Sequence, residues 1–104
     1  MKAVSIRADG SVEEFDQSYE TIKERVGGWL EIAPTPGSPF VMFCDEEGKL
    51  KNRPFNLTAN TLANQYRNWE DPLCGDVVLV GLPDDEGENT EFSLADWERI
   101  AVAA

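Results

Sequence analysis

Histidine is absent from this chain of 104 residues, and that absence removes several classes of function. Without imidazole there is no Ser-His-Asp triad, no Cys-His dyad and no histidine metal ligand, and the usual general base near neutral pH is missing. The only cysteines, Cys44 and Cys74, are thirty positions apart, so we do not expect a zinc site. We expect no metal, no cofactor and no catalytic residues of a recognisable type.

Positive charge is also scarce. Nine Lys and Arg stand against twenty Asp and Glu, which gives a formal net charge of −11. Binders of nucleic acid and of anionic membranes need basic surfaces, so we expect neither direct nucleic-acid binding nor membrane binding. No apolar run is long enough to span a bilayer, and residues 1–10 carry no secretory pattern. We therefore expect a cytoplasmic protein with reduced thiols.

What is present is an ordinary globular composition, with 41% hydrophobic and 28% charged residues. Apolar or alternating patterns predict strands over residues 2–7, 12–15, 29–33, 40–44, 49–51 and 76–82. Helical spacing and capping patterns predict helices over residues 18–26, 56–67 and 93 onwards. We predict a single α+β domain over residues 1–104, with a mixed or antiparallel sheet of about 4–6 strands and three helices.

Two of these strands, 40–44 and 76–82, are apolar on both faces, which is typical of central strands. We expect their side chains to be buried at Val41, Phe43, Val78 and Val80. Gly27 and Gly28 are expected to end the first helix, and Asn56 to cap the second. The residues expected on the buried side of the second helix are Leu57, Leu62 and Tyr66.

Most of the negative charge lies in the last third of the chain. Residues 69–104 hold ten acids and one base, whereas residues 1–68 hold ten acids and eight bases. Acidic residues are most closely spaced over residues 84–88. This segment predicts a solvated turn, a cation-binding loop, or a negative surface for a basic partner. Its spacing does not match an EF-hand loop. The candidate partner-binding residues are Asp84, Asp85, Glu86, Glu88 and Glu91.

The basic residues form a smaller cluster. Lys49, Lys51 and Arg53 alternate, so a strand would place all three on one face. They follow the acidic turn Asp45–Glu47 directly. One interpretation is that they neutralise this turn; the other is an anion site for a phosphate-bearing small ligand, beside a helix start. The candidate ligand-binding residues are Glu47, Lys49, Lys51, Arg53 and Asn56.

Three stretches, in this order, carry a resemblance to a known family. They are Gly27-Gly28-Trp29-Leu30-Glu31, then Asp45-Glu46-Glu47-Gly48-Lys49-Leu50 with Pro54, Asn56 and Ala59, then Cys74-Gly75-Asp76-Val77-Val78-Leu79-Val80-Gly81. The order resembles a small domain family of unknown function that is common in actinobacteria, their phages and other mobile elements. The resemblance implies a phage or mobile-element setting, in which small acidic proteins often act on host machinery. It implies no catalytic residues.

Our leading hypothesis is therefore a non-enzymatic phage or mobile-element accessory protein. It would bind a host macromolecule, expected to be a host protein, through the acidic last third of the chain in the host cytoplasm. The alternative is a small-ligand binder that sequesters a phosphorylated metabolite or nucleotide signal through the basic cluster. A small enzyme without a recognisable motif is the third hypothesis.

Overall fold

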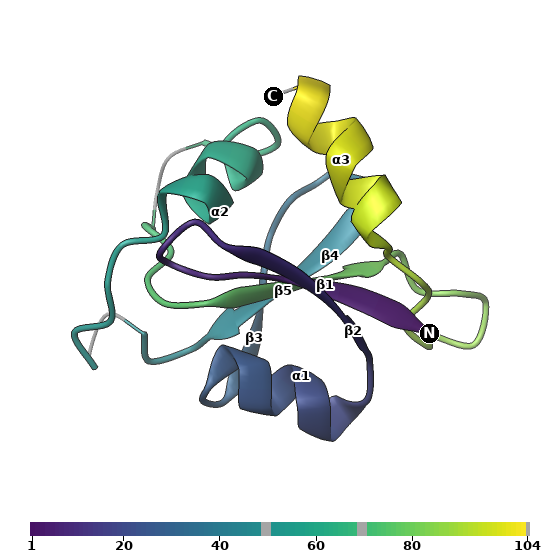
Figure 1. Cartoon of the computed structure of the whole chain (residues 1–104), viewed down its shortest axis with the longest axis horizontal. Coiled ribbons are helices and arrows are strands. Elements are labelled where there is room, and N and C mark those ends of the chain that lie inside the picture. Colours follow the sequence, from purple (N-terminus) through teal and green to yellow (C-terminus); the bar gives the residue numbers. More distant parts are fainter. Residues whose placement is uncertain (49–50, 69–70, 104) are drawn as a thin grey trace.

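The computed structural model describes residues 1–48, 51–68 and 71–103. Within these residues the chain forms five strands and three helices (Figure 1). They are β1 (Lys2–Ile6), β2 (Val12–Asp16), α1 (Tyr19–Val26), β3 (Leu30–Ala33), β4 (Phe40–Asp45), α2 (Leu57–Ala63), β5 (Val77–Gly81) and α3 (Leu94–Ala103). The predicted α+β class and the single domain architecture with three helices are confirmed. Lys51 lies in a turn rather than in the predicted strand 49–51, whose other two positions lie outside the described residues.

The sheet has the strand order β2-β1-β5-β4-β3, and every neighbouring pair is antiparallel. β5 lies in the centre, where Ser5 of β1 pairs with Val78 on one side and Phe43 of β4 pairs with Val78 on the other. Because β5 is covered on both faces, it is fully buried along its length. This position explains why its sequence is apolar without alternation.

Helices cover both faces of the sheet (Figure 1). α1 packs on one face, where Ile22 and Val26 meet Phe15, Val78 and Val80. α2 and α3 lie on the opposite face, over a larger core that includes Phe40, Met42 and Leu79. Alternate residues of each strand point to opposite faces, so each strand contributes side chains to both cores.

The expectation for the two central strands is correct for β5 and only partly correct for β4. Val78 and Val80 are fully buried, whereas Val41 and Phe43 are half-buried. Both half-buried side chains point to the α1 face. α1 has only eight residues and packs over β5 and β4, so the part of that face toward β3 is left partly open. β4 is the second strand from the edge rather than the centre of the sheet.

The helix ends follow the predicted caps. Gly27 closes α1 in the left-handed conformation (φ 83°), and the Asn56 side chain accepts a hydrogen bond from the Ala59 amide at the start of α2. α2 ends at Ala63 rather than at the predicted residue 67, because the next amides bond to carbonyls three residues back. Leu57, expected to be buried, is exposed on the first turn, while Leu62 is buried and Tyr66 packs against the core.

Candidate functional site

The acidic segment predicted to bind a partner is an ordered loop between β5 and α3. Asp84 organises it: its Oδ1 accepts hydrogen bonds from the amides of Glu86 (2.9 Å) and Glu88 (3.0 Å). Backbone bonds between Asp84 and Glu88 and between Gly81 and Thr90 close the loop as a hairpin. We call residues 83–91 the acidic loop. Its shape is fixed by its own backbone and by one carboxylate.

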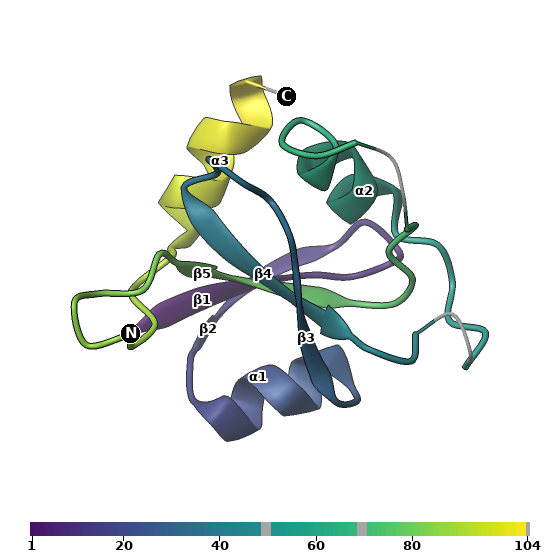
Figure 2. The same cartoon turned by 180° about the vertical axis from the view of Figure 1, so that it is seen from behind.

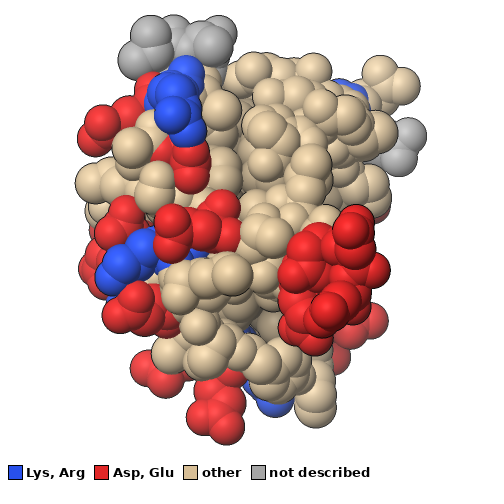
Figure 3. Space-filling model, turned by 90° about the vertical axis from the view of Figure 1, so that its right-hand side faces the viewer, with Lys and Arg blue, Asp and Glu red and all other residues tan. Residues whose placement is uncertain are grey.

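The remaining carboxylates of the acidic loop face solvent. Asp85, Glu86 and Glu88 are exposed, and no ion pair between described residues involves them or Asp84. Only Glu91 is tied to the fold, by accepting a bond from the Lys2 amide at 3.1 Å. Figure 3 faces the end of the molecule where the acidic loop projects. Acidic side chains far outnumber basic ones there, and one compact acidic patch contains no Lys or Arg.

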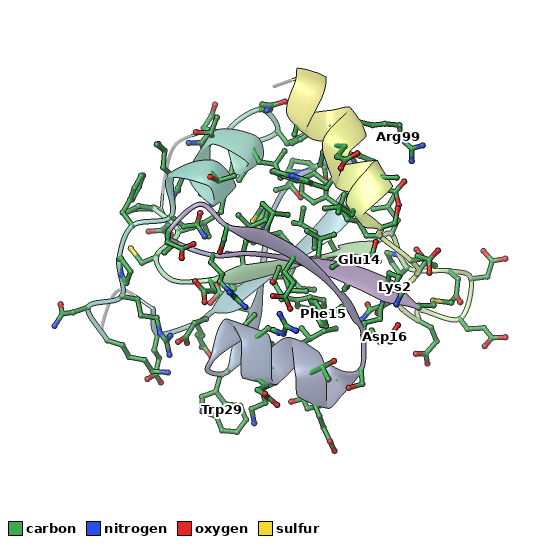
Figure 4. All side chains as sticks on the ribbon, viewed as in Figure 1. Lys2, Glu14, Phe15, Asp16, Trp29 and Arg99 are labelled. Carbon is green, nitrogen blue, oxygen red and sulfur yellow. The ribbon has the colours of Figure 1, made fainter. Side chains whose placement is uncertain are left out.

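Several acids elsewhere in the molecule have basic partners. Lys2 pairs with Asp16 at 2.8 Å where β1 and β2 meet (Figure 4), and Arg25 pairs with Glu13 at 2.6 Å. Each of these pairs lowers the pKa of its carboxyl below the usual value. Arg99 pairs with Asp96, whose carboxylate also caps α3 at Ser93. The acidic loop differs from these regions in holding four exposed acids within five positions, none of which forms an ion pair among the described residues.

The predicted anion site is built around Asp45, the last residue of β4. The Asp45 side chain is fully buried, and its Oδ2 lies 3.0 Å from both Lys51 Nζ and Arg53 Nε. Its Oδ1 accepts a hydrogen bond from the Glu47 amide at 2.9 Å. Burial raises the pKa of Asp45, but the Glu47 amide and the two cations outweigh that effect and hold it below its usual value. Lys51 and Arg53 therefore neutralise the acidic turn, as the first interpretation expects.

Gly27 and Gly28 of the first motif and Gly75 of the third lie against this ion cluster. A Cβ at Gly28 would lie 2.5 Å from Asp45 Oδ2, and a Cβ at Gly75 would lie 2.7 Å from Arg53 Cδ. Arg53 also donates to the Gly27 carbonyl at 2.6 Å. The cluster thus joins the end of α1, the end of β4 and the segment before β5. We call Asp45, Lys51 and Arg53 the Asp45 cluster.

The other members of the predicted anion site lie in different settings. Asn56 is fully buried, and its Nδ2 donates to the carbonyls of Ile6 (3.0 Å) and Gly75 (2.9 Å). Glu47 is exposed in the turn, and Lys49 lies outside the described residues. The structure brings Lys51 and Arg53 together but holds Asn56 in the core. Phosphate binding at these residues stays a prediction, and an anion there would compete with Asp45 for both cations.

A groove on the open part of the α1 face was not predicted from the sequence. It has a volume of about 620 Å³ and is lined by Tyr19 and Ile22 of α1, Leu30 and Ile32 of β3, and Phe43 of β4. Gly87, Glu88 and Asn89 of the acidic loop form one end of it. Tyr19 and Ile32 are 65% and 57% exposed. The period-two pattern at Leu30 and Ile32 indicated a shared face, but it did not indicate that this face is uncovered.

A smaller cavity of about 250 Å³ lies on the opposite face of β3. Glu31, Cys44, Arg67 and Cys74 are among its lining residues. Burial raises the pKa of the Cys44 thiol to about 11. Among residues 1–48, 51–68 and 71–103, no group of three or more Cys, Asp or Glu is placed to hold a metal ion. Over the same residues no helix is both long and apolar enough to cross a membrane.

A family model described as "Domain of unknown function (DUF3846)" matches residues 1–101, and the chain belongs to this family. No curated protein and no solved structure matches it. The family assignment confirms that the chain is a small domain of unknown function.

Proposed function

We propose that this protein is a non-enzymatic accessory protein of a phage or mobile element, which binds a basic surface of a host protein in the host cytoplasm. The resemblance of the sequence motifs supports the setting. The unpaired acidic loop supports the mode of binding. It carries Asp84, Asp85, Glu86 and Glu88 on an ordered hairpin, exposed and without basic neighbours within ion-pair distance among the described residues.

The physical reason is electrostatic. Like charges held close together repel, which costs stability unless a partner of opposite charge is present. A rigid hairpin keeps these charges in place, so little conformational entropy is lost when a basic partner binds. Long-range attraction raises the association rate of such a complex and makes it sensitive to salt.

The test compares two variants with the same change in net charge. The loop variant carries Asp85→Asn, Glu86→Gln and Glu88→Gln, and it keeps Asp84 because Asp84 organises the hairpin. The control variant carries Asp9→Asn, Glu24→Gln and Glu98→Gln, which are exposed acids on other segments. Each protein is immobilised and exposed to nuclease-treated host lysate at low salt, and the captured proteins are quantified by mass spectrometry.

We expect basic host proteins that the wild type and the control variant capture equally and that the loop variant loses. High salt should release the same proteins, because the Debye length shortens from about 10 Å at 0.1 M to about 3 Å at 1 M. If the loop variant captures the same proteins as the wild type at low salt, the acidic loop is only a solvated turn and the proposal fails.

A further inference from the structure

The sheet has two edge strands, β2 and β3, and they differ in how they are protected. β2 has the sequence Val-Glu-Glu-Phe-Asp, whose three acids are typical of an edge that resists further pairing. Its Glu14 carboxylate also accepts a bond from the Leu94 amide of α3 at 2.7 Å. β3 has the sequence Leu-Glu-Ile-Ala, with one acid. Figure 2 shows β3 in front of β4, at the edge of the sheet.

The register of β3 leaves its outer backbone groups unpaired. The amide of Glu46 donates to the Trp29 carbonyl at 3.0 Å, and Leu30 and Ile32 are opposite Asp45 and Phe43. Residues of an antiparallel edge strand alternate between facing the neighbour and facing outward. The N–H and C=O groups of Leu30 and Ile32 therefore face away from β4. No backbone hydrogen bond from another described segment reaches them.

The two faces beside this edge differ in chemistry. On the α1 face, Leu30 and Ile32 border the apolar groove with Tyr19 and Phe43. On the opposite face, Glu31 borders the smaller cavity with Glu46. Arg67, the basic residue among those lining that cavity, already donates to Asn64 Oδ1 and to the Asp71 carbonyl. An added strand would thus meet apolar side chains on one face and carboxylates on the other.

We infer that β3 binds an extended segment of the partner protein, which joins the sheet as a sixth strand. This inference rests on the proposed function and specifies its partner: the segment alternates apolar with basic side chains. Its apolar residues pack in the groove beside Leu30 and Ile32, and its basic residues face Glu31 and Glu46. A second copy of this chain fits poorly, because a net charge of −11 on each copy repels the other.

The acidic loop and the β3 edge then act on one ligand. Glu88 stands at the end of the groove, so a basic residue beyond the added strand reaches the acidic loop. The acidic loop speeds the encounter, and the backbone bonds and the groove hold the segment after it has bound. Mutation of the loop should change the association rate, and mutation of the edge should change the dissociation rate.

The first experiment selects ligands without assuming a partner. Wild-type protein is used to select from a display library of short random peptides at low salt. We expect enriched peptides in which β-branched or aromatic residues alternate with Lys or Arg. Enrichment of no peptide, or of peptides without this alternation, would overturn the inference.

The second experiment tests backbone pairing directly. Each enriched peptide is synthesised in two forms that are N-methylated on alternate residues, so that each form keeps its N–H groups along only one edge. Only one edge of an added strand faces β3, so one form should bind about tenfold more weakly than the other, or not at all. Equal affinities for the two forms would mean that no strand is added.

Protein variants separate the two proposals. Ile32→Pro removes an outward N–H and leaves the ladder to β4 intact, and it should weaken peptide binding about tenfold. Leu57→Pro is the matched control, because Leu57 is also exposed and proline is favoured at the first position of a helix. Its affinity should equal that of the wild type. The peptide comparison uses wild-type protein, so it holds even if Ile32→Pro folds poorly.

The loop variant and sedimentation complete the test. If the loop variant captures host proteins normally while the N-methylated forms differ, the acidic-loop proposal fails and the β3 inference stands. If the loop variant loses its host proteins while the two N-methylated peptides bind equally, the acidic-loop proposal stands and the β3 inference fails. Wild-type protein should sediment as a monomer at high salt. A dimer that Ile32→Pro converts to a monomer would show that a second copy occupies the edge.

Discussion

The Asp45 cluster and the acidic loop are both rich in charge, but they use it in opposite ways. Asp45 is fully buried, forms ion pairs with Lys51 and Arg53 and accepts a hydrogen bond from the Glu47 amide. Gly28, beside it, leaves room for its carboxylate. In the acidic loop, Asp85, Glu86 and Glu88 are exposed and have no basic partner among the described residues. The first arrangement joins distant segments of the fold, whereas the second leaves charge available for another molecule.

The comparison shows that a charged motif in a sequence does not by itself mark a binding site. The charged residues that accompany the family's motif glycines include those that hold the fold together. Charges that contribute nothing to the fold are the better candidates for function, because no intramolecular contact explains them. Removing charge should therefore have opposite consequences for stability in the two regions.

The largest effect is expected from Asp45→Ala. The substitution leaves Lys51 and Arg53 without their buried counter-ion and empties the space between Gly28 and the turn. Breaking a buried pair usually costs 3–5 kcal/mol, but both cations are partly exposed and gain hydration, so we expect a loss of about 2–4 kcal/mol. Urea denaturation measures it. Asp85→Asn in the acidic loop is the control and should change stability by less than about 0.5 kcal/mol. A loss below 1 kcal/mol for Asp45→Ala would contradict the assigned role.

A smaller effect is expected from Gly28→Ala, which places a Cβ 2.5 Å from Asp45 Oδ2. The crowding should cost about 1–3 kcal/mol in the free energy of unfolding. If the cause is contact with Asp45, Gly28→Ala should cost little in the Asp45→Ala background, so the two changes should be strongly non-additive. Additive losses would show that the cost arises in the backbone of Gly28 instead.

The pH dependence of stability should differ between wild type and Asp45→Asn. The pKa of Asp45 is lowered in the folded state, so its carboxylate stabilises the fold above its unfolded pKa of about 3.9. This contribution is lost as the pH falls through the folded pKa. The gap in unfolding free energy between the two proteins should be constant above about pH 5 and narrow below about pH 4. A gap that stays constant down to pH 3 would mean that the carboxylate charge of Asp45 adds nothing.

Local signals in the sequence predicted most of the fold. The apolar run of β5, Gly27 after α1 and the capping residue Asn56 act over a few neighbouring positions, and the structure confirms each of them. The predicted length of α2 was wrong. After Ala63 the amides of Gln65 and Tyr66 bond to carbonyls three residues back, which ends the α-helix.

Features that depend on distant parts of the chain could not be predicted. Arg53 reaches the Gly27 carbonyl across 26 positions, and nothing in its neighbourhood indicates that contact. Asp45 is one of three consecutive acids, and only the course of β4 decides which of them is buried. The open groove likewise results from the short reach of α1 over β4 and β3, which depends on strand order.

The smallest effect on stability is expected in the acidic loop, and its sign should be opposite to that of Asp45→Ala. The loop variant, Asp85→Asn, Glu86→Gln and Glu88→Gln, removes exposed charges that repel one another and keeps the Asp84 bonds that shape the hairpin. We expect its free energy of unfolding to equal or exceed that of the wild type by up to about 0.5 kcal/mol.

Salt should change the thermal stability of the wild type and of the loop variant to different extents, and this difference provides the control. Added salt screens the repulsion between loop carboxylates in the wild type, so its thermal midpoint should rise more with sodium chloride than that of the loop variant. A control variant with Asp9→Asn, Glu24→Gln and Glu98→Gln removes equal charge and should keep most of the wild-type salt response. If the loop variant instead unfolds at a lower temperature at every salt concentration, its carboxylates hold the hairpin in place. The acidic loop would then resemble the Asp45 cluster, and its charge would be explained by the fold.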